Sequence, residues 1–122
     1  MSHKQLASET LRVVAQRFKI LAEPARLEVL NVLRKGPLNV SELIAATGLN
    51  QANLSKHLQI LHAGGFVMRR RDGLFVIYAL ADASVFTLCD IMCGQLQRHA
   101  KTVSDTVTKV ATYGKLRARS SR

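Results

Sequence analysis

The chain of 122 residues has no tryptophan, two prolines, two cysteines and only 8 acidic residues. Two cysteines four positions apart cannot form the framework of a secreted disulfide scaffold, so we expect free thiols in a reducing compartment. The sequence also has no apolar run long enough to span a bilayer, and its first 14 residues have no apolar signal core. These absences predict a cytoplasmic protein with no membrane segment.

Motifs for catalysis are missing as well. The sequence contains no recognisable nucleophile motif, no glycine-rich phosphate loop and no carboxylate pair placed for acid–base chemistry, so we predict that it is not an enzyme. Its 18 lysines and arginines give a formal net charge of +10. A globular domain this basic typically binds a polyanion. The basic residues are spread along the chain, which favours nucleic acid over a membrane surface.

Residues 41–65 predict two short helices joined by a tight turn. We expect Ser41 to cap a first helix over residues 42–47, and Asn50 to cap a second helix that ends near residue 63. Glycines are expected at the turn and after the second helix, where a helix commonly ends. These glycines are Gly48, Gly64 and Gly65.

The second of these helices has two chemically different faces. One face repeats leucine at helical spacing, which predicts a buried side, and His57 at its border is predicted to be structural. The other face carries amide, hydroxyl and basic groups, which hydrogen-bond base edges and phosphates in a DNA major groove. The alternative is an ordinary amphipathic surface helix. The predicted DNA contacts are Gln51, Ala52, Asn53, Ser55, Lys56 and Gln59.

Residues 66–80 are rich in β-branched and aromatic side chains and predict a β-hairpin. We expect strands over residues 67–71 and 74–80, joined by a two-residue turn at Asp72-Gly73. Two strands alone are marginally stable, so the hairpin must pack on the helices. Three arginines near its tip predict a second phosphate-binding arm, and a solvated charged turn is the alternative. They are Arg69, Arg70 and Arg71.

Further helices are predicted over residues 5–22, 24–35 and 83–114, the last of them capped by Asp82. In the last helix, apolar residues recur at alternating steps of four and three, which is typical of a helix packed on a partner helix. The first helix has a similar stripe, so we predict a two-fold homodimer through the terminal helices. The stripe of the last helix is Val85, Cys89, Met92, Leu96, His99, Val103, Thr106 and Val110.

Three segments in this order, FKILAEPARLEVLNVL, LNQANLSKHLQILHAGGFV and RRRDGLFVIYAL, resemble the ArsR/SmtB family of bacterial repressors. The resemblance covers about residues 14–96, and LSKHLQILHAGGFV is its most specific part. It implies a mainly α-helical winged helix-turn-helix fold with a small β-hairpin, dimeric through the terminal helices. It also implies a palindromic double-stranded DNA operator, released when a metal ion, metalloid or thiol-reactive signal binds. We expect one domain over residues 1–122, with a disordered basic tail over residues 115–122.

The family's known sensing sites are not matched by this sequence. Where some members have Cys-Val-Cys in the third helix, residues 39–41 are Asn-Val-Ser. Where zinc sensors have Asp-x-His on the last helix, Asp82 is followed by Ala83 and Ser84. Members that sense persulfide use a cysteine in the second helix, which has none here.

Cys89 and Cys93 are four residues apart and should face the same side of a helix. Two thiolates can bind a thiophilic ion such as arsenite, cadmium, zinc or copper(I), but a complete site needs help from His3, His99 or a second subunit. Disulfides are easier between subunits than within one helix. Alternatively, both thiols only pack in the interface. The sequence thus leaves open a repressor released by a metal or redox signal and a DNA-binding regulator without such sensing.

Overall fold

The structure is a computed structural model that describes residues 5–102. The predicted tail, and the part of the last predicted helix after Thr102 with Val103, Thr106 and Val110, lie outside the described residues. Among residues 5–102, no helix has both the length and the apolar content to cross a membrane. The described elements are α1 (Ser8–Leu21), α2 (Pro24–Leu33), β1 (Leu38–Asn39), α3 (Val40–Thr47), α4 (Gln51–Ala63), β2 (Val67–Asp72), β3 (Phe75–Leu80) and α5 (Ser84–Thr102).

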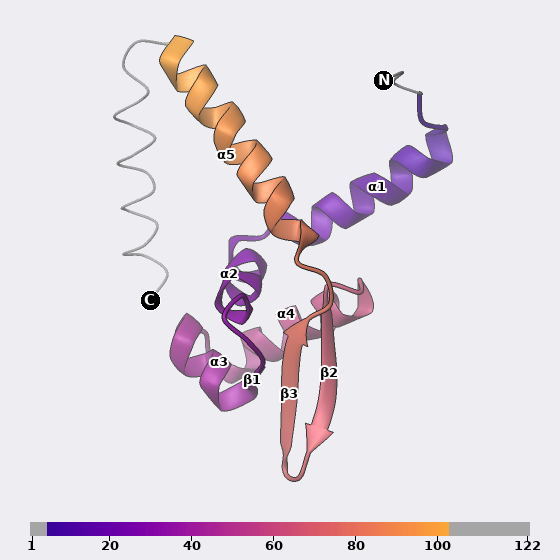
Figure 1. Ribbon diagram of the computed structural model, residues 1–122. Coiled ribbons are helices and arrows are strands. Elements are labelled where there is room, and N and C mark those ends of the chain that lie inside the picture. Colours follow the sequence, from indigo (N-terminus) through magenta and orange to yellow (C-terminus); the bar gives the residue numbers. More distant parts are fainter. Residues whose placement is uncertain (1–4, 103–122) are drawn as a thin grey trace.

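The first and last of these helices project from one end of the molecule, and the β2–β3 hairpin projects from the other (Figure 1). Helices α2, α3 and α4 lie between the two ends and carry most of the buried side chains. The leucine face of α4 is buried as its spacing predicts, and each fully buried leucine contributes about 1.5–3 kcal/mol. The fully buried leucines of α2, α3 and α4 are Leu30, Leu33, Leu43, Leu54, Leu58 and Leu61.

The α3–turn–α4 unit begins with a different cap from the predicted one. Asn39 Oδ1 accepts from the Glu42 N–H at 2.8 Å, and Glu42 Oε1 accepts from the Asn39 N–H at 2.9 Å, forming a capping box. This pair satisfies two helix-terminal backbone groups at once, so the helix starts at Val40 and the predicted Ser41 cap is wrong. The α4 cap is as predicted, since Asn50 Oδ1 accepts from the Asn53 N–H at 2.8 Å.

The sheet has three antiparallel strands in the order β1-β3-β2, one more than the predicted hairpin. The predicted turn is also displaced. Asp72 pairs with Phe75, so the two-residue loop is Gly73-Leu74 rather than Asp72-Gly73. Gly73 has φ 62° and Leu74 has a negative φ, which matches a turn that needs glycine at its first central position. The Asp-Gly pair therefore marks the turn one residue early.

Helix α5 is attached to the body by its first turn. Asp82 Oδ1 accepts from the N–H of Ser84, the first residue of α5, at 2.9 Å, and this hydrogen bond lowers the pKa of Asp82. Val85 and Phe86 are buried, and the Arg34 guanidinium lies 4.2 Å from the centre of the Phe86 ring. Further along, the apolar stripe is largely exposed within the single chain.

Candidate nucleic-acid interface

The polar face of α4 is the first part of the candidate interface. All six predicted DNA-contact residues of this helix are exposed, while its leucine face is fully buried against the core. The structure therefore brings these six side chains together on one helix, available to a ligand. The helix that carries them is capped by Asn50 and packed through its leucine face in the free chain.

His57 lies between the two faces and is half-buried. Its Nδ1 atom lies 3.3 Å from Arg26 Nη1. Because a guanidinium can only donate, Nδ1 must be the acceptor, which places the proton of the neutral ring on Nε2. Burial lowers the pKa of His57 below 6.5, and the Arg26 charge lowers it further. The neutral ring thus holds Arg26 of α2 against the middle of α4.

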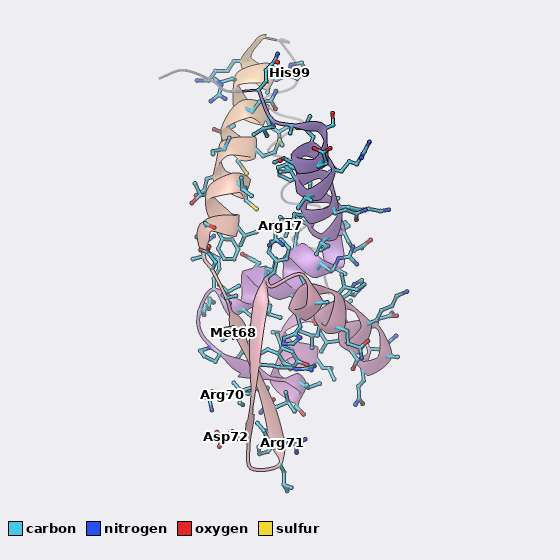
Figure 2. All side chains as sticks on the ribbon, turned by 90° about the vertical axis from the view of Figure 1, so that its right-hand side faces the viewer. Arg17, Met68, Arg70, Arg71, Asp72 and His99 are labelled. Atoms are coloured by element: carbon cyan, nitrogen blue, oxygen red, sulfur yellow. The ribbon has the colours of Figure 1, made fainter. Side chains whose placement is uncertain are left out.

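The three arginines of β2 do not form one cluster. Strand alternation places Arg69 and Arg71 on the sheet face that carries buried Val67, and Arg70 on the opposite face. Figure 2 shows Arg71 and the Arg70–Asp72 pair on opposite sides of the hairpin. Arg70 Nη1 lies 3.8 Å from Asp72 Oδ2, an exposed ion pair worth less than about 1 kcal/mol. Arg69 and Arg71 therefore lie together on the face that carries Val67, and Arg70 on the other face is paired with Asp72.

The hairpin tip also carries apolar surface that sequence reasoning missed. Leu74 is 95% exposed and the neighbouring Phe75 is 56% exposed. The sequence analysis placed Leu74 inside a strand, because it took Asp72-Gly73 as the turn. Counting the turn from Gly73 would have placed Leu74 at the tip.

The two thiols lie on α5, far along the chain from the basic surfaces. Cys93 is exposed and Cys89 is half-buried. Burial raises the pKa of the Cys89 thiol, and neighbouring Cys93 and Asp90 raise it further. Within residues 5–102, no three or more His, Cys, Asp and Glu side chains are grouped so as to hold a metal ion. His99 therefore does not complete a site with the thiols, and His3 lies outside the described residues.

A groove of about 570 Å³ lies between α1 and α5. Cys89 is part of its wall, and nearly all of its lining is apolar. Much of this lining is exposed, including Phe18, Ile91 and Met92. The terminal helices thus present a continuous unpartnered apolar face at the end of the molecule opposite the hairpin tip.

Comparison with known families gives a match over residues 23–69 to the family described as "Bacterial regulatory protein, arsR family". The HTH-type transcriptional regulator NmtR of Mycobacterium tuberculosis is 39% identical over 85 residues, covering 70% of this chain and 71% of that protein. The uncharacterized HTH-type transcriptional regulator Rv0081 of Mycobacterium tuberculosis is 36% identical over 115 residues, covering 93% of this chain and 96% of that protein.

Solved structures give the same result. The crystal structure of Mycobacterium tuberculosis Rv0081 has a TM-score of 0.69 at 34% identity and covers 83% of this chain and 99% of that one. The winged helix-turn-helix DNA-binding domain Mb0332 from Mycobacterium bovis, described as homodimeric, has a TM-score of 0.66 at 32% identity. It covers 81% of this chain and 95% of that one. The predicted winged helix-turn-helix fold is confirmed.

Proposed function

Because the chain belongs to the ArsR family of bacterial regulatory proteins, we propose that it is a homodimeric repressor that reads a palindromic operator with α4. Family membership itself makes the chain a DNA-binding transcriptional regulator rather than an enzyme, as the sequence predicts. The observation that carries the rest is the exposed polar face of α4, opposite a fully buried leucine face. Such a repressor works in the cytoplasm, where its operator is.

In this proposal α4 lies in the major groove. The amides of Gln51, Asn53 and Gln59 match the donor and acceptor pattern of adenine, and Lys56 matches guanine or a phosphate. Ser55 adapts as donor or acceptor. The small Ala52 lets the helix backbone approach the base edges closely.

The hairpin acts as a second arm on the DNA backbone. Arg69 and Arg71 lie on the face nearer α4 and can reach phosphates beside the groove that α4 enters. Phosphate contacts of this kind fix the register of a protein on the duplex without reading its sequence. Arg70 contributes less, because Asp72 partly neutralises it.

The homodimer forms through α1 and α5 in this proposal. Their exposed apolar side chains and the groove between them form an apolar surface that suits a second copy. The related Mb0332 domain is described as homodimeric. A two-fold dimer presents its two reading helices to half-sites about 34–36 Å apart, which is the reason for expecting a palindromic operator.

The releasing signal acts at Cys89 and Cys93 in this proposal. Arsenite, cadmium and zinc are ions that thiolates bind well, but the described chain offers only these two thiols and no third ligand beside them. Residues 5–102 of one subunit therefore do not hold a complete metal site, and an ion would need a further ligand from His3 or from a second subunit. A disulfide-forming oxidant needs only thiols, and exposed Cys93 is open to it. The competing view is a regulator with no metal or thiol sensing.

The test begins with selection of a duplex from random DNA by the purified full chain. We expect an enriched palindrome, bound by a dimer, with log affinity falling linearly as log salt rises by about 0.9 per phosphate contact. Analytical ultracentrifugation of the complex gives the stoichiometry. No enriched sequence, or an affinity indifferent to salt, would refute the proposal.

A further inference from the structure

Helix α1 is fastened to the end of α4 by an arginine. Arg17 Nη1 donates to the carbonyl oxygen of Gly64, the residue that ends α4, at 2.9 Å. The same guanidinium lies over the Phe66 ring, 4.5 Å from its centre, in the position labelled in Figure 2. One side chain of α1 thus contacts both the carbonyl group of the C-cap residue of α4 and the first aromatic residue after the helix.

A second arginine fastens the end of α1 to the middle of α4. Arg26 Nε donates to the carbonyl oxygen of Ile20 at 2.6 Å, and Nη2 donates to that of Lys19 at 3.5 Å. These carbonyls end α1, where a cation is favourable because the helix dipole is negative there. The remaining Arg26 nitrogen, Nη1, reaches His57 of α4 at 3.3 Å. A single guanidinium therefore bridges the terminus of α1 and the central turn of α4.

Between the Arg17 and Arg26 contacts, Ile20 of α1 packs directly against Gly64 at the end of α4. A Cβ at Gly64 would lie 2.8 Å from Ile20 Cδ1 and 3.2 Å from the Phe66 ring. A side chain at residue 64 would therefore push Ile20 and Phe66 aside. The φ of Gly64 is −80°, so glycine is needed here for space rather than for backbone conformation.

We propose that Arg17 and Arg26 are positioning residues that fix the angle between α1 and α4, and thereby set the operator half-site spacing that the dimer accepts. The inference rests on the proposed homodimer, because only a dimer has two reading helices to space. In that dimer α1 belongs to the interface and α4 to the DNA, so their mutual angle sets the separation of the two α4 helices.

The geometry makes a small change of angle consequential. The 13 residues of α4 span about 20 Å at 1.5 Å per residue. A tilt of about 10° about one end moves the other end by roughly 3.5 Å, close to the rise of one base pair. Loosening the two contacts should therefore blur the preferred half-site spacing by about one base pair.

The experiment measures affinity for the selected operator, for versions with one base pair added or removed at its centre, and for a single half-site. The variants are Arg17→Met and Arg26→Lys, since a lysine ammonium cannot span from the α1 carbonyls to His57. Arg12→Met is the matched control, because Arg12 is exposed on the same helix and the variant loses the same charge. Circular dichroism and sedimentation check that each variant is a folded dimer.

We expect the parent and Arg12→Met to discriminate against altered spacing by about tenfold, within the range of site-to-site couplings in proteins. Arg17→Met and Arg26→Lys should discriminate by less than about threefold, with half-site affinity within about twofold of the control. Loss of affinity that is equal on every duplex would overturn the positioning role. If Arg26→Lys does not fold, Arg17→Met alone decides. If the parent protein binds operators of all three spacings equally well, the proposal that it binds its operator as a homodimer would be overturned as well.

Discussion

Substitutions of single exposed side chains on α4 should weaken DNA binding without destabilising the fold. Replacing Gln51, Ser55 or Lys56 with Ala should cost about 1–3 kcal/mol in operator binding, since each removes a base-edge or phosphate contact. The thermal midpoint should stay nearly unchanged, because exposed substitutions usually alter stability by less than about 0.5 kcal/mol. Fluorescence anisotropy with the operator and with a scrambled duplex measures both affinities. A variant with all three changes and the parent's operator affinity would show that α4 does not read DNA.

The arginines of β2 should differ in effect because they lie on opposite faces of the hairpin. Arg71→Ala should weaken operator and scrambled DNA alike and reduce the salt slope by about 0.9 for each subunit of the bound dimer. Arg70→Ala should do less, since Asp72 already shares its charge. Conversely, Asp72→Asn should tighten binding to any duplex. Equal losses for Arg70→Ala and Arg71→Ala in a salt titration would contradict this distinction.

What the sequence predicted at this scale depended on local spacing. The buried side of α4 followed from leucines at helical intervals, and the structure buries Leu54, Leu58 and Leu61. Strand alternation alone divides the arginines of β2, but the sequence analysis treated the three together. The pairing of Arg70 with Asp72 could not be predicted, because it requires Asp72 to lie within β2 and so depends on the strand register. That register was wrong in the prediction, since the loop is Gly73-Leu74.

Among the elements, the contact between α2 and α4 should respond to acid. Arg26 and Glu23 of the α2 segment and Lys56 of α4 surround His57, and burial with the Arg26 charge lowers its pKa below 6.5. The unfolded chain therefore binds a proton at His57 at higher pH than the folded chain does, so stability should fall as pH drops below about 6.5. Urea unfolding between about pH 5 and pH 7 measures this loss.

The control for the acid effect is His57→Gln. Its side-chain oxygen can accept from Arg26 at every pH, so the variant should lose the part of the pH dependence that comes from this site. The two remaining described histidines, His62 and His99, are unchanged in it. An identical pH profile in the parent and the variant would show that His57 does not contribute.

Helices and strands could be predicted where a short segment contained the residues that mark its ends. Asn50, Gly48 and Pro24 marked helix boundaries that the structure confirms. The strand β1 was missed because its two residues gain strand geometry only by pairing with Ile77 and Tyr78. The cap of α3 was misplaced because two candidate caps stand two residues apart, and the side chain of Glu42 decides between them.

At the scale of the whole molecule, we expect Cys89 and Cys93, at the end opposite the β2–β3 hairpin, to control release from the operator. The Cys89→Ser, Cys93→Ser double variant should bind the operator as the parent does, but should not be released by arsenite, cadmium or a disulfide-forming oxidant. Exposed Cys93 should react before Cys89, whose pKa is raised by burial. Gel-shift titrations of the parent, both single variants and the double variant measure this. Release of the double variant at the parent's inducer concentration would assign both thiols to packing alone.

Motif order and the resemblance to the ArsR/SmtB family predicted the overall fold and the DNA-binding role, which family membership confirms. They did not predict how the two ends of the molecule are connected. Arg17 and Gly64 are 47 residues apart, and Arg26 and His57 are 31 residues apart. Sequence patterns extend over one or two helices and give no information on contacts between residues this far apart, so these two contacts are known only from the folded structure.

The order β1-β3-β2 has a consequence for how the free protein behaves in concentrated solution. Strand β2 is an edge strand with unpaired backbone groups along one side, and such edges recruit strands from other molecules. Three consecutive arginines followed by Asp72 line this edge, and like charges repel an approaching copy. Removing all three arginines at once should therefore make the protein self-associate through the β2–β3 hairpin. The residues proposed to bind phosphates would thus also keep the unbound chains apart.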